Sequence, residues 1–142
     1  NSPYKYYFMD LGLRNARLNF RQFGKPHLME NLIYNELRIR GYNVDVGIVP
    51  SVMRDNDGRQ QRSHFEIDFI CNMGSKRYYI QSAYRMETDE KVKQEKSSLL
   101  KINDSFKKII IIGDESPIIR DDNGITIMNV YDFLLKNNSL EL

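Results

Sequence analysis

Apolar residues recur at spacings of three and four over residues 26–40, the spacing of one face of an α-helix. The positions that carry this pattern are Leu28, Leu32, Ile33 and Leu37. Pro26 suits the first helical turn, where an amide hydrogen has no partner in any case, and Gly41 suits the helix end. The segment therefore predicts an amphipathic helix.

Three strand patterns follow this helix. Residues 42–49 alternate apolar and polar side chains, which is the period of a strand with one buried face. The polar stretch 51–63 predicts a break after it, with Asp57-Gly58 as the turn. The two arginines of this stretch, Arg59 and Arg62, could contact a phosphate backbone, or the segment could be a solvated hairpin arm. Residues 65–71 and 77–84 are two further strands, and the short segment 72–75 between them predicts a hairpin.

The second half of the chain alternates helix and strand. Thr88 is a predicted N-cap for a helix over residues 89–102. Residues 106–113 contain four consecutive isoleucines, which is typical of a strand covered on both faces. A short strand at 124–130 leads into a terminal helix at 131–135. The core order of helix, three strands, helix and strand predicts an α/β domain with a mixed central sheet flanked by helices.

Composition and charge narrow the class of protein. The chain has 142 residues, of which 41% are hydrophobic and 28% charged, as expected for one globular domain. Its only cysteine, Cys71, excludes an intrachain disulfide and predicts a buried thiol. The formal net charge of +2 is too small to indicate nucleic-acid binding by itself. Without a long apolar run or a signal-peptide pattern, we expect a cytoplasmic protein that does not enter a membrane.

The sequence lacks the common nucleotide-binding motifs and any histidine pair at metal-ligand spacing. There is no GxxxxGK[ST] phosphate loop and no GxGxxG motif, so this chain by itself should not hydrolyse ATP or bind dinucleotides by those routes. His27 and His64 lie far apart, and neither has a partner at metal-ligand spacing. The chain opens on NSPYKYYFMD without an initiator methionine, so we expect it to be a domain of a longer protein.

The carboxylates in the stretch FEIDFI are the strongest candidates for catalytic or metal-binding residues. Strand alternation would put Glu66 and Asp68 on one face, and Gln81 on the next strand would meet Asp68 across the hairpin. Glu30 on the first helix could add another carboxylate. Magnesium binds oxygen ligands of this kind, so these four residues form a candidate metal site. The competing interpretation is that Glu66 and Asp68 form the solvated face of a strand.

This order of elements and acids resembles the restriction-endonuclease-like PD-(D/E)XK fold, whose core order is αβββαβ. The resemblance implies metal-dependent catalysis by Glu30, Asp68 and Gln81, with Glu66 as an additional acid and Glu36 as an alternative to Glu30. In that family the third strand ends its motif on a lysine, where this chain has Ala83.

A narrower resemblance covers residues 5–135. The segments that carry it are KYYFMDLGLRNA, MENLIYNELRIRGYNV, EIDFI, YYIQSA, QEKSSLLKI and GITIMNVYDFLL. Together they are similar to the C-terminal domain of unknown function found behind the ATPase module of many bacterial and archaeal AAA+ proteins. The resemblance implies that ATP belongs to an N-terminal module of the same polypeptide.

Three functional interpretations follow from the missing lysine. In the first, the chain is a degenerate nuclease-like domain that engages DNA, RNA or protein for the ATPase. It would not cleave efficiently, because Ala83 can neither position a water nor stabilise negative charge. An active magnesium-dependent nuclease would need another lysine, for which Lys91, Lys93 and Lys96 are the candidates, although these also suit a solvated helix face. A protein-interaction module would have no metal site.

Tyrosines beside basic residues are a further candidate nucleic-acid surface. They are Tyr4, Tyr6, Tyr7, Tyr78, Tyr79 and Tyr84, near Lys5, Lys76, Arg77 and Arg85. Aromatic rings stack on bases, but they are equally favoured in strands for packing, so both interpretations stand at this point.

Overall fold

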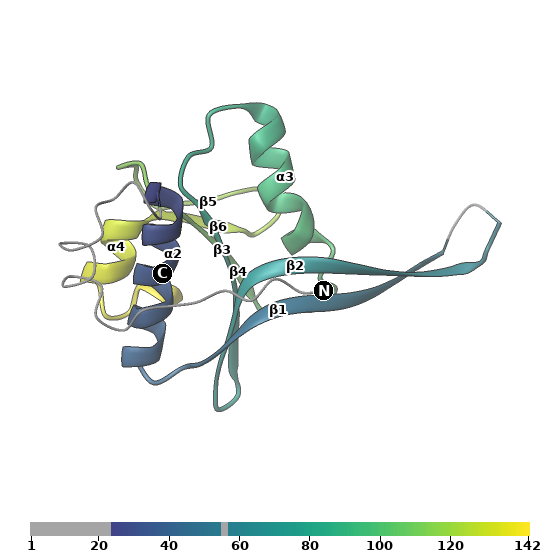
Figure 1. The fold of residues 1–142 in the computed structure, drawn as a ribbon, viewed down its shortest axis with the longest axis horizontal. Helices are drawn as coiled ribbons and strands as arrows, with labels where there is room; N and C mark the ends of the chain where they lie inside the picture. The colour runs from purple at the N-terminus through teal and green to yellow at the C-terminus, as the bar shows by residue number, and fades with distance from the viewer. Residues whose placement is uncertain (1–23, 55–56) are drawn as a thin grey trace.

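A six-stranded mixed sheet with helices on both faces forms the domain (Figure 1). The predicted α/β class, with a mixed sheet flanked by helices, is confirmed. The computed structural model describes residues 24–54 and 57–142, with the backbone alone at 48–54 and 60–65. The elements are α2 (Gly24–Ile39), β1 (Asn43–Arg54), β2 (Gln60–Met73), β3 (Lys76–Ala83), α3 (Asp89–Leu100), β4 (Lys107–Ile112), β5 (Ile119–Arg120), β6 (Thr126–Asn129), α4 (Val130–Leu135) and η1 (Ser139–Glu141). Within the described part of the chain, no helix is long and apolar enough to cross a membrane.

The sheet has the strand order β1-β2-β3-β4-β6-β5. The first three strands are antiparallel neighbours, and β2 and β3 are joined by a tight turn in which Gly74 has φ 61°. β4 then pairs in parallel with β3 on one side and with β6 on the other. The four isoleucines of β4 are buried, in agreement with the predicted strand, and the two-residue β5 is an element that the sequence pattern did not predict.

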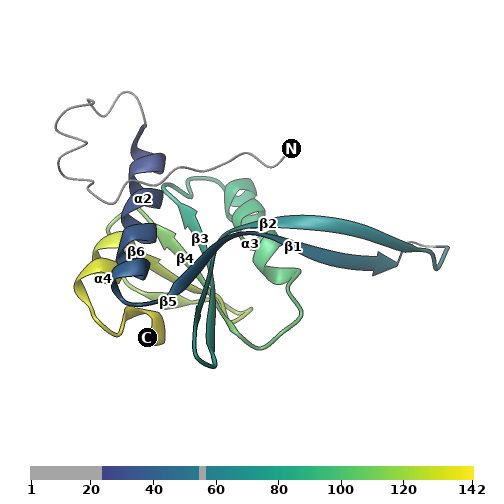
Figure 2. The same ribbon diagram turned by 60° about the horizontal axis from the view of Figure 1, so that its bottom comes forward.

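Helices α2 and α4 lie on one face of the sheet and α3 on the other (Figure 2). A hydrophobic cluster covers each of the two faces. One cluster, the α2 cluster, joins α2 and α4 to the sheet, with Ile33, Leu37 and Phe133 fully buried. The other, the α3 cluster, joins α3 to the opposite face of the sheet through Leu99. Thr88 caps α3 as predicted, since its side chain accepts a hydrogen bond from the Lys91 amide.

Cys71 is buried in the α2 cluster, as the sequence predicts. Burial raises the pKa of its thiol to about 12, and the negative charge of Asp45 adds to the effect. The thiol therefore stays protonated and packs as a small apolar side chain.

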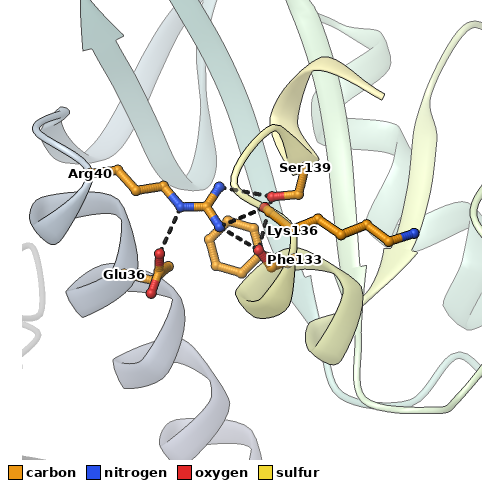
Figure 3. Close-up of polar contacts among 5 residues, drawn as sticks. All are labelled: Glu36, Arg40, Phe133, Lys136 and Ser139. Atoms are coloured by element: carbon orange, nitrogen blue, oxygen red, sulfur yellow. Dashed lines mark hydrogen bonds and ion pairs between the residues drawn. The ribbon is translucent and has the colours of Figure 1, made fainter.

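Arg40, one residue beyond α2, ties this helix to the C-terminal elements (Figure 3). Its Nε donates to Glu36 at 2.7 Å and its Nη1 to the Ser139 hydroxyl at 2.8 Å. Its Nη2 donates to the backbone carbonyls of Phe133 and Lys136. The guanidinium thus satisfies carbonyls near the end of α4, where the helix leaves them without intrahelical partners.

The polar stretch 51–63 is not the simple break that the sequence suggested. β1 and β2 stay paired out to Arg54 opposite Gln60, and the ribbon they form extends away from the body of the domain (Figures 1 and 2). Of the interpretations offered above, a hairpin arm is the one the backbone adopts. Hydrophobic alternation could not reveal it, because β3 pairs with β2 only from Phe69 onward and, among the described residues, no further strand continues the sheet along the arm.

Candidate functional site

Asp68 and Gln81 meet where β2 separates from β3. The last pair of the ladder between these strands is Phe69 with Ile80, so Asp68 and Gln81 are the next opposed positions. The Gln81 Oε1 accepts a hydrogen bond from the Asp68 amide at 2.7 Å, and Asp68 Oδ2 accepts one from the Ser82 amide at 2.8 Å. Side chains thus take over the hydrogen bonding at the fork between the strands. The predicted contact of Gln81 with Asp68 across the hairpin is confirmed.

A β-bulge directly beside this fork changes which way β2 side chains point. Between the pairs Asp45–Ile70 and Gly47–Ile67, β1 advances two residues while β2 advances three. Ile67 consequently packs in the α3 cluster and Phe69 in the α2 cluster, although strict alternation would put them on the same face.

The expectation that Glu66 and Asp68 share a face is therefore wrong. The bulge falls between Ile67 and Ile70, so it includes Asp68 but not Glu66, and it turns Asp68 to the face that carries Gln81. Glu66 is exposed and does not line the pocket that Asp68 lines. Of the four predicted metal ligands, Glu66 is the one that the structure separates from the others.

Glu30 reaches the same pocket from α2. Its side chain is 20% exposed and lies 3.9 Å from the His27 ring, an ion pair only when that imidazole is protonated. The alternative acid, Glu36, is bound to Arg40 and does not line the pocket. The preference for Glu30 over Glu36 agrees with this geometry.

The pocket has a volume of about 460 Å³ at the C-terminal end of β3, where α2 begins. The residues that line it are Pro26, Glu30, Asp68, Gln81, Ser82, Ala83, Tyr84, Arg85, Lys91 and Glu95. The structure therefore brings together Glu30, Asp68 and Gln81 from two strands and a helix that lie far apart in sequence. Their catalytic role stays a prediction.

Two basic side chains border these acids. Lys91 pairs with Glu95 at 3.2 Å, one turn along α3. Arg85 lies beside Glu87 at 3.2 Å, and this hydrogen bond raises the pKa of the guanidinium further above its ordinary value. Both cations could contact a phosphate at the mouth of the pocket.

Among the three lysines considered as replacements for the missing one, Lys91 is the one that lines the pocket. Lys96 is bound to Asp121 at 2.8 Å, and Lys93 is exposed. Sequence reasoning did not single out Glu95, although its spacing of four from Lys91 on a helix is the signal of an ion pair.

Ala83 occupies the last position of β3 and lines the pocket. It is 3% exposed and packs in the α3 cluster. The position at which the resemblance predicts a lysine in an active nuclease therefore lines the pocket with a methyl group in place of a charge.

The oxygen donors of the pocket fit a magnesium ion only in part. Two carboxylates and an amide oxygen are suitable ligands, and magnesium commonly binds one or two carboxylates together with water and phosphate. Within residues 24–54 and 57–142, however, no three His, Cys, Asp or Glu side chains are grouped closely enough to hold a metal ion. The donors thus suit an ion shared with a bound phosphate better than one held by the protein alone.

Two described tyrosines of the candidate stacking surface, Tyr78 and Tyr79, serve packing. Tyr78 contacts Tyr42 edge to face at 5.9 Å, and the Tyr79 hydroxyl donates to Asp104. Both are buried, so neither ring is open to a base. Tyr84 lines the pocket. Tyr4, Tyr6 and Tyr7, with the KYYFMDLGLRNA segment and Lys5, lie outside the described residues.

Comparison with known protein families gives a match that spans residues 25–133. That range contains every described residue of the candidate site. The chain belongs to the family described as a domain of unknown function, DUF4143. The expected membership of a family of unknown function is thereby confirmed.

A relative of this DUF4143 chain occurs in Haemophilus influenzae, where it is described as an uncharacterized protein. The two are 33% identical over 132 residues, which is 93% of this chain and 29% of the relative. The chain therefore spans less than a third of the length of that relative.

Proposed function

We propose that this chain is a nuclease-like domain of an AAA+ class ATPase, and that it engages nucleic acid through the Glu30–Asp68–Gln81 pocket without cutting it efficiently. The observation that carries the proposal is the convergence of these three side chains, from α2, β2 and β3, on one pocket. Solvated strand acids without a function would have no reason to meet a helix acid and a buried glutamine, which is 6% exposed.

The order of elements supports a restriction-endonuclease-like core. From α2 to β4 the chain runs helix, three antiparallel strands, helix and a parallel strand, which is the αβββαβ order of that fold. In that framework Glu30, Asp68 and Gln81 stand at the three acidic motif positions. The additional acid expected at Glu66 has no place in the proposal, because it lies outside the pocket.

Magnesium is the cofactor that this pocket would take. Glu30 and Asp68 would hold the ion, while Gln81 orients Asp68 through the Asp68 amide. A bound ion supplies polarisation of a phosphate oxygen. Arg85 and Lys91 add positive charge around a phosphate.

Ala83 is the reason for proposing binding rather than efficient cleavage. A lysine at this position would contribute a fixed charge to the transition state, and loss of one such contact commonly lowers the rate by about 10² to 10³. Lys91 is held by Glu95, so its charge is already partly compensated.

Each rival interpretation has one observation in its favour. An active magnesium-dependent nuclease is favoured by Lys91, which lines the pocket and could replace the missing lysine. A protein-interaction module is favoured by the fork itself, since Asp68 and Gln81 have a structural role without any ligand.

The ATPase assignment rests on the resemblance of the sequence and on the length of the relative. A polypeptide more than three times as long as this chain has room for a separate ATP-binding module. We propose that the ATPase module of the same polypeptide is a partner of this domain and that the protein acts in the cytoplasm.

A thermal-stability titration with magnesium or manganese tests the proposed pocket. A ligand specific to the folded state raises the melting temperature, so millimolar metal should stabilise the wild-type chain but not Asp68→Asn. Glu66→Gln is the matched control, since it removes an acid two residues away that does not line the pocket. It should respond as the wild type does. Metal-independent melting of all three chains would overturn the pocket assignment and favour the interaction module.

A further inference from the structure

Acidic side chains outnumber basic ones among the described residues that line the pocket. The acids are Glu30, Asp68 and Glu95, and the cations are Arg85 and Lys91. Together these side chains carry one more formal negative charge than positive. Such a pocket repels a phosphate group, although the proposed function requires it to accept one. A divalent cation bound among the acids would reverse the sign of the charge.

Glu95 differs from the two proposed metal ligands in what it contacts. It pairs with Lys91 at 3.2 Å between the carboxylate Oε1 and the ammonium Nζ, one turn away on α3. Within residues 24–54 and 57–142, no three acids lie close enough together to hold a metal ion with Glu95 as a third ligand. Glu95 therefore acts on the pocket through its charge and through its contact with Lys91.

The exposure of the two paired side chains decides which of them can turn towards a ligand. The Glu95 side chain is 16% exposed, whereas that of Lys91 is 45% exposed. The carboxylate is thus fixed in the wall of the pocket, and the ammonium group lies nearer to water. An ion pair this exposed contributes little to stability, so a phosphate can compete with Glu95 for Lys91.

The second cation of the pocket is paired in a different way. Arg85 contacts Glu87 at 3.2 Å, but the Glu87 side chain is 67% exposed and does not line the pocket. Water and salt screen a carboxylate at such a position. Glu95 is consequently the acid whose charge opposes a phosphate inside the pocket without serving as a proposed metal ligand.

We infer that Glu95 makes phosphate binding in the pocket conditional on a divalent cation. Without the cation, the charge of Glu95 leaves the pocket negative and keeps Lys91 paired. Removal of that charge alone makes the acids and cations of the pocket equal in number and leaves Lys91 available to a phosphate. This inference rests on the proposed function and names a regulation of the same pocket.

Binding of a labelled DNA duplex in magnesium and in EDTA tests the inference, with fluorescence anisotropy as the readout. The wild-type chain should bind about tenfold more tightly in magnesium. Cations in solution otherwise compete for phosphates and weaken binding, so a gain with magnesium indicates a site on the protein. Glu95→Gln, which keeps the shape of the side chain, should bind about tenfold more tightly than wild type in EDTA, and this gain should shrink as salt is added.

Glu90→Gln is the matched control, because it removes the same charge from the same helix at an exposed position outside the pocket. Its affinity in EDTA should stay within about twofold of wild type. Melting temperatures establish that both variants are folded. Equal gains in the two variants would overturn the inference, because only net charge would then matter.

The outcome is separable from that of the proposed pocket. Magnesium that raises the melting temperature of the wild type but not of Asp68→Asn, with wild-type DNA affinity equal in magnesium and EDTA, would retain the metal pocket and reject the role of Glu95. Absence of duplex binding by folded wild type and Glu95→Gln in both conditions would overturn the inference together with the proposed engagement of nucleic acid.

Discussion

Asp68 and Gln81 bridge the fork between β2 and β3: the Asp68 amide donates to the Gln81 side chain, and the Asp68 carboxylate accepts from the Ser82 amide. Two backbone N–H groups that would lose their ladder partners at the fork are satisfied in this way. The same two side chains line the pocket with Glu30. These hydrogen bonds hold Asp68 and Gln81 in place at the base of the β1–β2 hairpin arm.

Replacing Gln81 by methionine should destabilise the fold by about 1–3 kcal/mol, because the Asp68 amide then loses its side-chain acceptor in a partly buried position. Gln94→Met on the exposed surface of α3 is the matched control and should change stability by less than about 0.5 kcal/mol. Urea unfolding measures both. Equal, small effects of the two substitutions would show that the fork hydrogen bond contributes nothing to folding.

Arg40→Lys should cost about 1.5–3 kcal/mol of folding free energy, since an ammonium group cannot reach Glu36, Ser139 and two carbonyls at once. Arg38→Lys, an exposed position on the same helix, should be close to neutral. The comparison by urea unfolding isolates the contacts of the guanidinium from a general effect of losing arginine. Similar stabilities of the two variants would contradict the account of the C-terminal anchor.

Stability should fall as the pH rises above about 8.5, the pKa of a cysteine thiol in an unfolded chain. Burial raises the pKa of Cys71 to about 12 in the folded protein, so the unfolded state loses its proton first and is favoured. The loss attributable to the thiol should reach about 2 kcal/mol by pH 10. Cys71→Ala should lack this part of the pH dependence, measured by urea unfolding between pH 8 and 10. A wild-type slope that persists in Cys71→Ala would assign it to other groups.

Local signals along the chain predicted most of the fold. The helical spacing that led to Gly24–Ile39, the cap at Thr88 and the run of isoleucines in Lys107–Ile112 each depend on neighbouring residues. Membership of an α/β class with a mixed sheet followed from the order of these elements. Such features can be predicted because propensity and periodicity act over a few residues.

Features set by register and tertiary contact could not be predicted. The bulge beside Asp68 adds one residue to β2, and this reverses the predicted relation of Glu66 to Asp68. The anchoring of Arg40 to Ser139 joins positions 99 apart in sequence. Three of the four candidate ligands were nevertheless placed in one pocket, because Asp68 and Gln81 are neighbours in a short hairpin.

The central claim is that the pocket binds nucleic acid without efficient cleavage, and a cleavage assay tests it most directly. The wild-type chain and Asp68→Asn would be incubated with labelled duplex DNA and magnesium, with intact and cut strands resolved on a denaturing gel and binding followed in parallel. The account predicts that the wild-type chain binds the duplex and cuts it no faster than Asp68→Asn does. Rapid cutting by the wild type that disappears in Asp68→Asn would contradict it and would establish an active nuclease.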